Sequence, residues 1–129
     1  MAKASIDFNA PDIAALAEEA RQSDLDILPF GVIKLDRQGI VRFYSQAEAR
    51  LSGYNVSPLG RNLFDISQCA SREDLRARIM GAMESGAMEN TPVDLELAWF
   101  GDPNDPKREM RIRVQSARDG GVWMFIERD

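Results

Sequence analysis

The sequence predicts an α+β fold in which five strands form one antiparallel sheet, with helices on one face and an N-terminal helical cap. Two short segments rich in β-branched and aliphatic residues, 31–36 and 40–44, flank a turn signal at 36–39 and predict a hairpin. Residues 72–84 carry apolar side chains at helical spacing. Three further apolar segments follow toward the C-terminus. A hairpin, a helical excursion and a three-stranded meander together make one sheet layer and one helix layer.

Residues 12–22 predict the first helix, with Pro11 as an early helical residue and Asn9 as a possible cap. Its apolar positions are few and lie on one narrow stripe, at Ile13, Leu16, Ala17 and Ala20. A narrow stripe is typical of a helix that packs as a cover on a larger body. We therefore expect residues 1–26 to form a cap and residues 27–129 to form the core of a single domain.

A short connection at 24–29 leads into the predicted hairpin. Ser45 then follows as the expected N-cap of a short helix at 46–51. Glu48 stands three residues after Ser45, which is the spacing of a capping box. Residues 55–68 contain proline and glycine and predict no single regular element.

The helix at 72–84 repeats apolar residues every four positions, and the Ser-Gly pair at 85–86 predicts its end. Strands are predicted at 92–100 and 122–126, with a polar loop at 101–107. Between them, apolar Met110, Ile112 and Val114 alternate with polar Arg111, Arg113 and Gln115. This period of two predicts a half-buried strand whose arginines form the solvated face.

Composition excludes several classes of function. The net charge of −5 argues against a nucleic-acid binder and against docking on an anionic membrane. No apolar run approaches 18 residues, and the N-terminus lacks a hydrophobic signal core, so we expect a cytoplasmic protein. The chain has one cysteine and no histidine, which removes an internal disulfide, a Ser-His or Cys-His nucleophile pair and the usual zinc sites. We therefore expect neither a metal site nor an enzyme.

A set of residues along most of the chain resembles the photoactive yellow protein family, whose members are light sensors with the PAS fold. The set comprises Pro29-Phe30-Gly31-Val32-Ile33, Leu35-Asp36, Gly39, Tyr44, Ala47-Glu48, Ser52-Gly53, Gly60, Asn62, Phe64, Cys69, Ser85-Gly86, Trp123 and Phe125. The most specific part is a tyrosine, a glutamate four residues later, a hydroxyl four residues later again, and a cysteine at the end of the helical excursion.

The resemblance implies a role for each matching residue. Cys69 matches the cysteine that holds p-coumaric acid (4-hydroxycinnamic acid) as a thioester. Tyr44 and a protonated Glu48 match the two donors to the phenolate oxygen of this chromophore. Further residues expected around the chromophore are Ser52, Tyr54, Ile33 and Ile66.

The sequence also departs from the family pattern. Tyr54 stands where the family usually has an arginine over the mouth of the chromophore site, and Gln68 stands where proline commonly precedes the cysteine. Aliphatic residues replace the aromatic residues that better-known members carry on the third strand, at Val93, Leu95 and Leu97. We therefore expect similar anchor points and different pocket walls.

The resemblance implies a blue-light photoreceptor in which photoisomerisation is followed by proton transfer from Glu48 to the phenolate. A buried carboxylate left without its partner costs roughly 3–5 kcal/mol. A small domain has a total stability of only about 5–15 kcal/mol. Release of residues 1–26 is the expected response, read by an unknown downstream signalling protein. We expect a monomer or a weak dimer.

Plainer interpretations of the same residues stay open. A lone cysteine in a cytoplasmic domain is usually an inert thiol. Glu48 on its own would be the capping-box partner of Ser45, and one carboxyl cannot serve that role and the chromophore fully. The alternative function is a PAS domain without a chromophore that acts as an interaction or dimerisation module.

Overall fold

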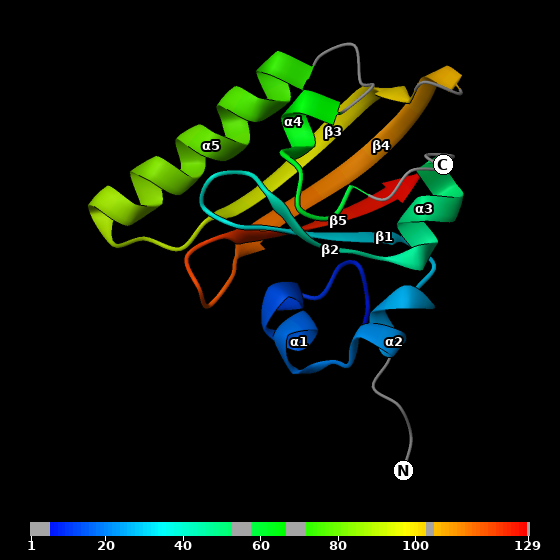
Figure 1. Cartoon of the computed structure of the whole chain (residues 1–129), viewed down its shortest axis with the longest axis horizontal. Coiled ribbons are helices and arrows are strands. Elements are labelled where there is room, and N and C mark those ends of the chain that lie inside the picture. The colour runs from blue at the N-terminus through cyan, green and yellow to red at the C-terminus, as the bar shows by residue number, and fades with distance from the viewer. Residues whose placement is uncertain (1–5, 53–57, 67–71, 103–104, 129) are drawn as a thin grey trace.

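Five strands form one antiparallel sheet in the order β2-β1-β5-β4-β3 (Figure 1). This computed structural model describes residues 6–52, 58–66, 72–102 and 105–128. The strands are β1 (Gly31–Leu35), β2 (Val41–Tyr44), β3 (Asp94–Asp102), β4 (Asp105–Ser116) and β5 (Val122–Arg128). The predicted α+β fold and its five-stranded antiparallel sheet are confirmed.

Helices lie on both sides of this sheet (Figure 1). On one side are α4 (Leu63–Ile66) and α5 (Arg72–Glu89), and on the other are α1 (Ile13–Glu19) and α2 (Gln22–Asp26). The short helix α3 (Gln46–Ser52) packs against β1. Within the described ranges, no helix is long and apolar enough to cross a membrane.

The sheet separates two apolar clusters because alternate side chains of each strand point to opposite faces. The first cluster joins α5 to the sheet through Ile33, Leu35, Val41, Leu75, Ile79, Met83, Ile112, Val114, Met124 and Ile126. The second cluster joins the N-terminal segment to the opposite face through Ile6, Phe8, Ile13, Leu25, Val32, Phe43, Trp123 and Phe125. The N-terminal segment therefore covers a face of the sheet, as the narrow apolar stripe predicts. The division into a cap at 1–26 and a core at 27–129 stays a prediction.

The N-terminal segment differs from the prediction in its helices. The single helix expected at 12–22 is two helices, because Ala20 and Arg21 both have extended backbone with ψ near 154° and 153°. Helix α2 occupies part of the stretch that was expected to be a connection. The expected cap at Asn9 is wrong, since α1 begins after Asp12 and the Asn9 side chain instead accepts a hydrogen bond from Arg111.

Two other element ends differ from the prediction. Helix α5 runs through the Ser-Gly pair at 85–86 and ends where Asn90 adopts a φ of 54°. There the Thr91 N–H donates to the Gly86 carbonyl at 2.9 Å, which is the bond of a left-handed helix end. The polar loop expected at 101–107 is also shorter than predicted, because β3 and β4 stay paired as far as Asp102 and Asp105.

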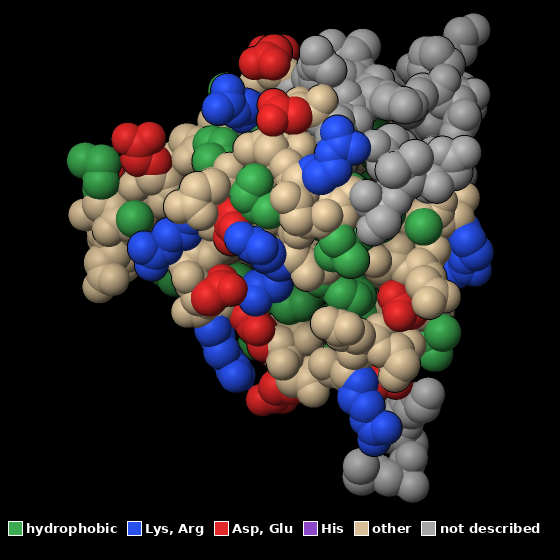
Figure 2. Space-filling model, in the orientation of Figure 1, with side chains coloured by type: hydrophobic (Ala, Val, Ile, Leu, Met, Phe, Trp, Pro, Cys, Tyr) green, Lys and Arg blue, Asp and Glu red, His purple; other side chains and the backbone are tan. Residues whose placement is uncertain are grey.

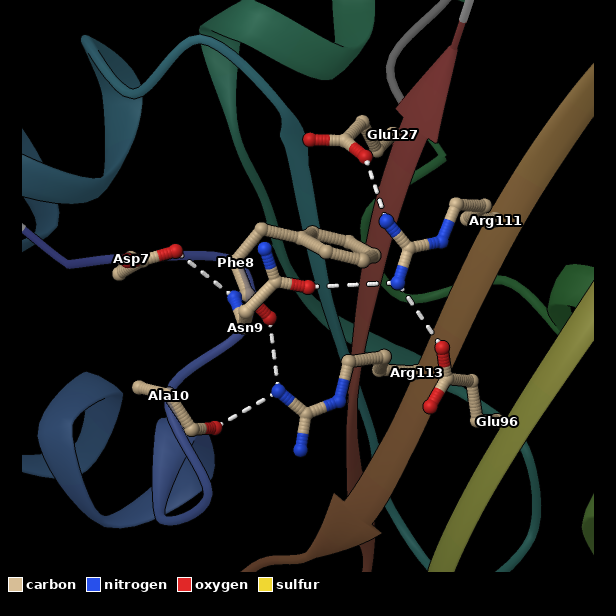
Figure 3. A network of polar contacts seen from close by, with 8 residues as sticks. All are labelled: Asp7, Phe8, Asn9, Ala10, Glu96, Arg111, Arg113 and Glu127. Carbon is tan, nitrogen blue, oxygen red and sulfur yellow. Dashed lines mark hydrogen bonds and ion pairs between the residues drawn. The ribbon is translucent and has the colours of Figure 1, made fainter.

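The arginines predicted on a solvated face of β4 are instead partners of the N-terminal segment (Figure 3). Arg113 is only 8% exposed, and its Nη1 donates to the carbonyls of Phe8 at 2.7 Å and Ala10 at 2.6 Å. Arg111 donates to the Asn9 side chain at 3.2 Å, and its guanidinium lies 5.2 Å from the centre of the Phe8 ring. The solvated-face prediction is therefore wrong for Arg113.

Gln115 extends this set of contacts along the same strand. Its Nε2 donates to the Pro11 carbonyl at 2.9 Å, and its Oε1 accepts from the Ala14 N–H at 2.9 Å. We call Arg111, Arg113 and Gln115 the β4 clasp. The clasp satisfies backbone groups of the N-terminal chain that would otherwise be buried without partners.

Candidate functional site

The predicted site residues with described side chains gather on the sheet face that α5 covers. Ile33 and Tyr44 are directly paired across β1 and β2, so their side chains point to the same face. Ile33 is 2% exposed in the first apolar cluster, and the half-buried Tyr44 packs against that cluster. The structure therefore brings these two residues together on one face, and their roles around a chromophore stay predictions.

Ser45 fixes the start of the helix that carries Glu48. The Ser45 N–H donates to the Val32 carbonyl at 2.9 Å, and the Ser45 Oγ accepts from the Val32 N–H at 3.0 Å. The same Oγ accepts from the Glu48 N–H at 3.1 Å, as an N-cap does. The Asp26 side chain at the end of α2 accepts from the Gln46 N–H at 2.9 Å. Helix α3 is thus attached at its first turn to both β1 and α2.

The carboxylate of Glu48 is held by Arg128 rather than by the helix start. Arg128 Nη1 lies 2.7 Å from Oε1 of Glu48, and Nη2 lies 2.8 Å from Oε2. Both side chains are only 5% exposed. The Ser45 N–H points to Val32 instead, so only the serine half of the predicted capping box forms.

The two parallel hydrogen bonds have a chemical consequence. A guanidinium opposite a carboxylate in this fork geometry makes a strong charge-assisted pair. An opposite charge at this distance favours the ionised form of the carboxyl group. Glu48 as the structure shows it is therefore a hydrogen-bond acceptor, whereas the role implied by the resemblance requires a protonated donor.

Gly31 provides the space in which this pair lies. A Cβ atom at position 31 would collide with Oε1 of Glu48. Position 31 lies on the same sheet face as Ile33, two residues later, and it pairs with Ile126 of β5. Arg128 lies two residues beyond Ile126 and so points to the same face. The ion pair, Ile33 and Tyr44 thus share one face of the sheet.

Arg128 and Gly31 are site residues that the sequence analysis missed. The alternation of the last strand contains the signal for Arg128, because Met124 and Ile126 are inward and position 128 continues the series. Gly31 belongs to the set of residues that resembles photoactive yellow proteins, and it is also a glycine at the start of a strand, where a small residue often marks a close approach.

The remaining predicted positions lie partly or wholly outside the described residues. Cys69 and Tyr54 belong to stretches that the structure does not describe, at 67–71 and 53–57. Ser52 ends α3 and Ile66 ends α4, but their side chains are outside the described part. Their roles around a chromophore stay predictions.

A groove of about 520 Å³ lies elsewhere, between the C-terminal half of α5 and the turn from β4 to β5. Arg37, Met83, Asn90, Thr91 and Gly120 are among its lining residues. None of the predicted site residues lines it. The chemistry of the buried ion pair, rather than the size of this groove, therefore identifies the candidate site.

Several curated proteins that are similar to this chain are photoactive yellow proteins. No protein-family model matches the chain. The photoactive yellow protein of Cereibacter sphaeroides is 28% identical over 127 residues, which are 95% of this chain and 97% of that protein. The photoactive yellow protein of Rhodobacter capsulatus is 29% identical over 127 residues, with the same coverage.

Solved structures agree on the fold. The photoactive yellow protein domain of the sensor histidine kinase Ppr from Rhodospirillum centenum matches with a TM-score of 0.63 at 24% identity, covering 89% of this chain and 99% of that one. The PAS domain of the histidine kinase ThkA matches with a TM-score of 0.56 at 23% identity, covering 76% and 97%. The chain thus has the PAS fold, and it is similar over nearly its whole length to photoactive yellow proteins, as its sequence predicts.

Proposed function

We propose that this protein is a blue-light photoreceptor that carries p-coumaric acid as a thioester on Cys69. The observation that supports it most is the buried ionisable group Glu48, on the same sheet face as Tyr44 and Ile33. Buried ionisable groups are uncommon in proteins, and functional sites are among the places where they occur. We further propose that the protein works in the cytoplasm as a sensor and is not an enzyme.

The described residues fit a group that carries a phenolate. Burying an anion without compensation is very costly, so such a group needs donors and a positive charge nearby. Tyr44 has a hydroxyl that can donate, and Arg128 supplies a buried cation on the same face. The family resemblance implies an arginine at position 54, where this chain has tyrosine, and Arg128 is a buried cation that could supply a positive charge instead.

The chromophore, when bound, supplies absorption of blue light and isomerisation of a double bond. The protein supplies the rest. Glu48 must leave Arg128 and take up a proton in order to donate from its carboxyl group in the dark. After light it gives up that proton and becomes a buried carboxylate again. The resulting change reaches an unidentified downstream signalling protein through movement of the N-terminal segment.

Attachment of the chromophore tests this proposal directly. Incubation of the full chain with activated p-coumaric acid is expected to give a yellow protein with one added hydroxycinnamoyl group by mass spectrometry. Cys69→Ala should stay colourless and unmodified under the same conditions. Colour retained by Cys69→Ala would refute a thioester at this residue, and a wild-type chain that takes up no pigment would refute the photoreceptor.

A second candidate function is a PAS interaction module that has no chromophore. The closed pair between Glu48 and Arg128 favours it, because both carboxylate oxygens already have partners at 2.7 and 2.8 Å. A module of this kind should associate with a second copy or bind a partner protein, and the contact should be made through a face of the sheet. Failure of pigment attachment together with a concentration-dependent dimer in sedimentation would support this candidate.

A further inference from the structure

We propose that Arg128 is the charge partner of Glu48 in every state in which Glu48 is ionised. These states are the pigment-free protein and the state reached after Glu48 has given up its proton; the second of them rests on the proposed function. Arg128 is thus a positioning residue for the proton donor. Its guanidinium holds the ionised carboxylate of Glu48 in one fixed position through two hydrogen bonds.

The geometry of the pair supports this role. The two hydrogen bonds engage both oxygens of Glu48 and two nitrogens of Arg128. Both side chains are 95% buried, so water does not compete for either of them. The pair joins α3 to the last residues of β5, two elements that the chain separates by 80 residues. Gly31 leaves the space that the carboxylate occupies, and any side chain there would expel it.

The net charge of the chromophore site depends on Arg128, on Glu48 and on the phenolic oxygen. Arg128 contributes one buried positive charge, which balances one negative charge among its neighbours. Glu48 and the phenolic oxygen are two acidic groups, and if both ionised they would leave a net buried negative charge. If both were protonated, the guanidinium would lack a balancing charge. The site is neutral when these two groups share one proton.

The shared proton can therefore lie either on the Glu48 carboxyl group or on the phenolic oxygen. In the dark it is on the Glu48 carboxyl, and the phenolate carries the negative charge. After light Glu48 would give up this proton to the phenolate oxygen, and the negative charge would then lie on Glu48. The number of protons and the net charge stay the same throughout. Arg128 then receives the carboxylate in the arrangement that the structure shows.

Other charged and titratable groups face this part of α3 among the described residues. Tyr44 lies on the same sheet face. Asp26 of α2 accepts from the Gln46 N–H at the start of the helix and has no part in the pair itself. Arg128 is the cation that contacts Glu48 directly. The ionisation of Glu48 should therefore depend on Arg128 more than on Asp26 or Tyr44.

The first test uses the full chain without pigment, so it does not depend on the photoreceptor proposal. Carboxyl-labelled glutamate allows the titration of Glu48 to be followed by carbon NMR. Arg128→Gln is expected to raise the pKa of Glu48 by about one unit or more, since a buried carboxylate without its cation is disfavoured. Arg128→Lys keeps the charge without the fork and should give an intermediate midpoint. The control is Arg42→Gln, which removes an exposed guanidinium that pairs with Asp36.

The second test uses the pigmented protein. If the two hydrogen bonds from Arg128 to ionised Glu48 stabilise the lit state more than the charge of Arg128 stabilises the dark phenolate, Arg128→Gln should speed dark recovery, because return of the proton to Glu48 becomes more favourable. Arg128→Lys should restore part of the lifetime, and Arg42→Gln should leave it unchanged. An equal lifetime in wild type and Arg128→Gln would overturn the role in the lit state.

The outcomes separate the two proposals. A Glu48 midpoint that does not move in either Arg128 variant overturns the pair, whether or not pigment attaches. If the chain never takes up pigment but the titration midpoint of Glu48 shifts in the Arg128 variants, the pairing of Glu48 with Arg128 is supported and the photoreceptor proposal is refuted. If Arg128→Gln does not fold, the titration of Glu48 is measured in Arg128→Lys instead. The double variant Glu48→Gln/Arg128→Gln should fold, because it removes both buried charges together.

Discussion

Gly31 has no side chain at the point where the carboxylate of Glu48 lies. Gly31→Ala should therefore force this carboxylate away from Arg128 and destabilise the protein by about 1–3 kcal/mol, the range for overpacking a filled site. Urea unfolding of the pigment-free chain measures the effect. Gly81→Ala is the matched control, because a Cβ there meets no atom within 4 Å. Gly81→Ala should be neutral or stabilising by about 0.5–1 kcal/mol in a helix interior. Equal effects of the two substitutions would contradict the close approach.

Glu48 has a second testable property at the scale of one residue. Glu48→Gln keeps a donor but cannot give up a proton. A weaker donor stabilises the ground-state phenolate less, so the absorption maximum of the pigmented protein should move to longer wavelength. The control is Glu84→Gln, on the side of α5 that lines the remote groove. A spectrum that is the same for wild type and Glu48→Gln would remove Glu48 from the chromophore's surroundings.

Sequence patterns predicted residues whose partners are close in the chain. The Ser45 cap was predicted because its partner, the Glu48 N–H, is three residues away. The partner of the Glu48 carboxylate is 80 residues away, and no local pattern reports such a pair. The return half of the capping box was consequently predicted and does not form. Family resemblance placed Glu48 and Tyr44 on one site, but it did not reveal Arg128.

At the scale of elements, the β4 clasp decides how firmly the N-terminal segment is attached. Arg113→Met keeps the apolar stem and removes the donors to the carbonyls of Phe8 and Ala10. Hydrogen bonds to charged groups contribute roughly 1.5–3 kcal/mol each. Amides of α1 should thus lose protection from hydrogen exchange by about tenfold or more, while those of β1 and β5 keep theirs. Arg42→Met is the control, since that side chain is 57% exposed and pairs with Asp36 rather than with the N-terminal segment. Unchanged protection of α1 in Arg113→Met would mean that apolar packing alone holds the segment.

The sequence predicted the strand β4 that carries the β4 clasp, but it did not predict that the N-terminal segment covers this face of the strand. Alternation along β4 correctly separated inward Met110, Ile112 and Val114 from the opposite face. It could not tell whether water or another segment covers that face, because long polar side chains suit both. Helix α5 shows a similar limit. A glycine inside a helix costs only about 1 kcal/mol, so the pair at 85–86 did not end it.

For the whole molecule, the structure connects the ion pair to the N-terminal segment. Asp26 of α2 binds the first turn of α3, which carries Glu48. A shift of Glu48 between the chromophore and Arg128 would move α3 and strain this contact. Light should then release α1 and α2 before the central sheet.

Hydrogen exchange of the pigmented protein in darkness and under illumination measures this release. Amides in α1 are expected to lose protection in the light while those of β5 keep it. Deletion of the residues before Leu25 should leave the colour nearly intact and slow dark recovery, because the lit state would have no segment to redock. The prediction fails if α1 keeps its dark protection when the pigment is fully converted.

The β4 clasp also sets an order for biosynthesis. Phe8 and Ala10 leave the ribosome early, but their partner Arg113 is made 105 and 103 residues later. At bacterial and eukaryotic rates of about 5–20 residues per second, this is a delay of roughly 5–20 seconds. During that time the side chains of Ile6, Phe8 and Ile13 have no sheet to cover. These residues are made before the strands that they cover. They can dock only after both β4 and β5 have emerged, because Trp123 and Phe125 of β5 belong to the same apolar cluster.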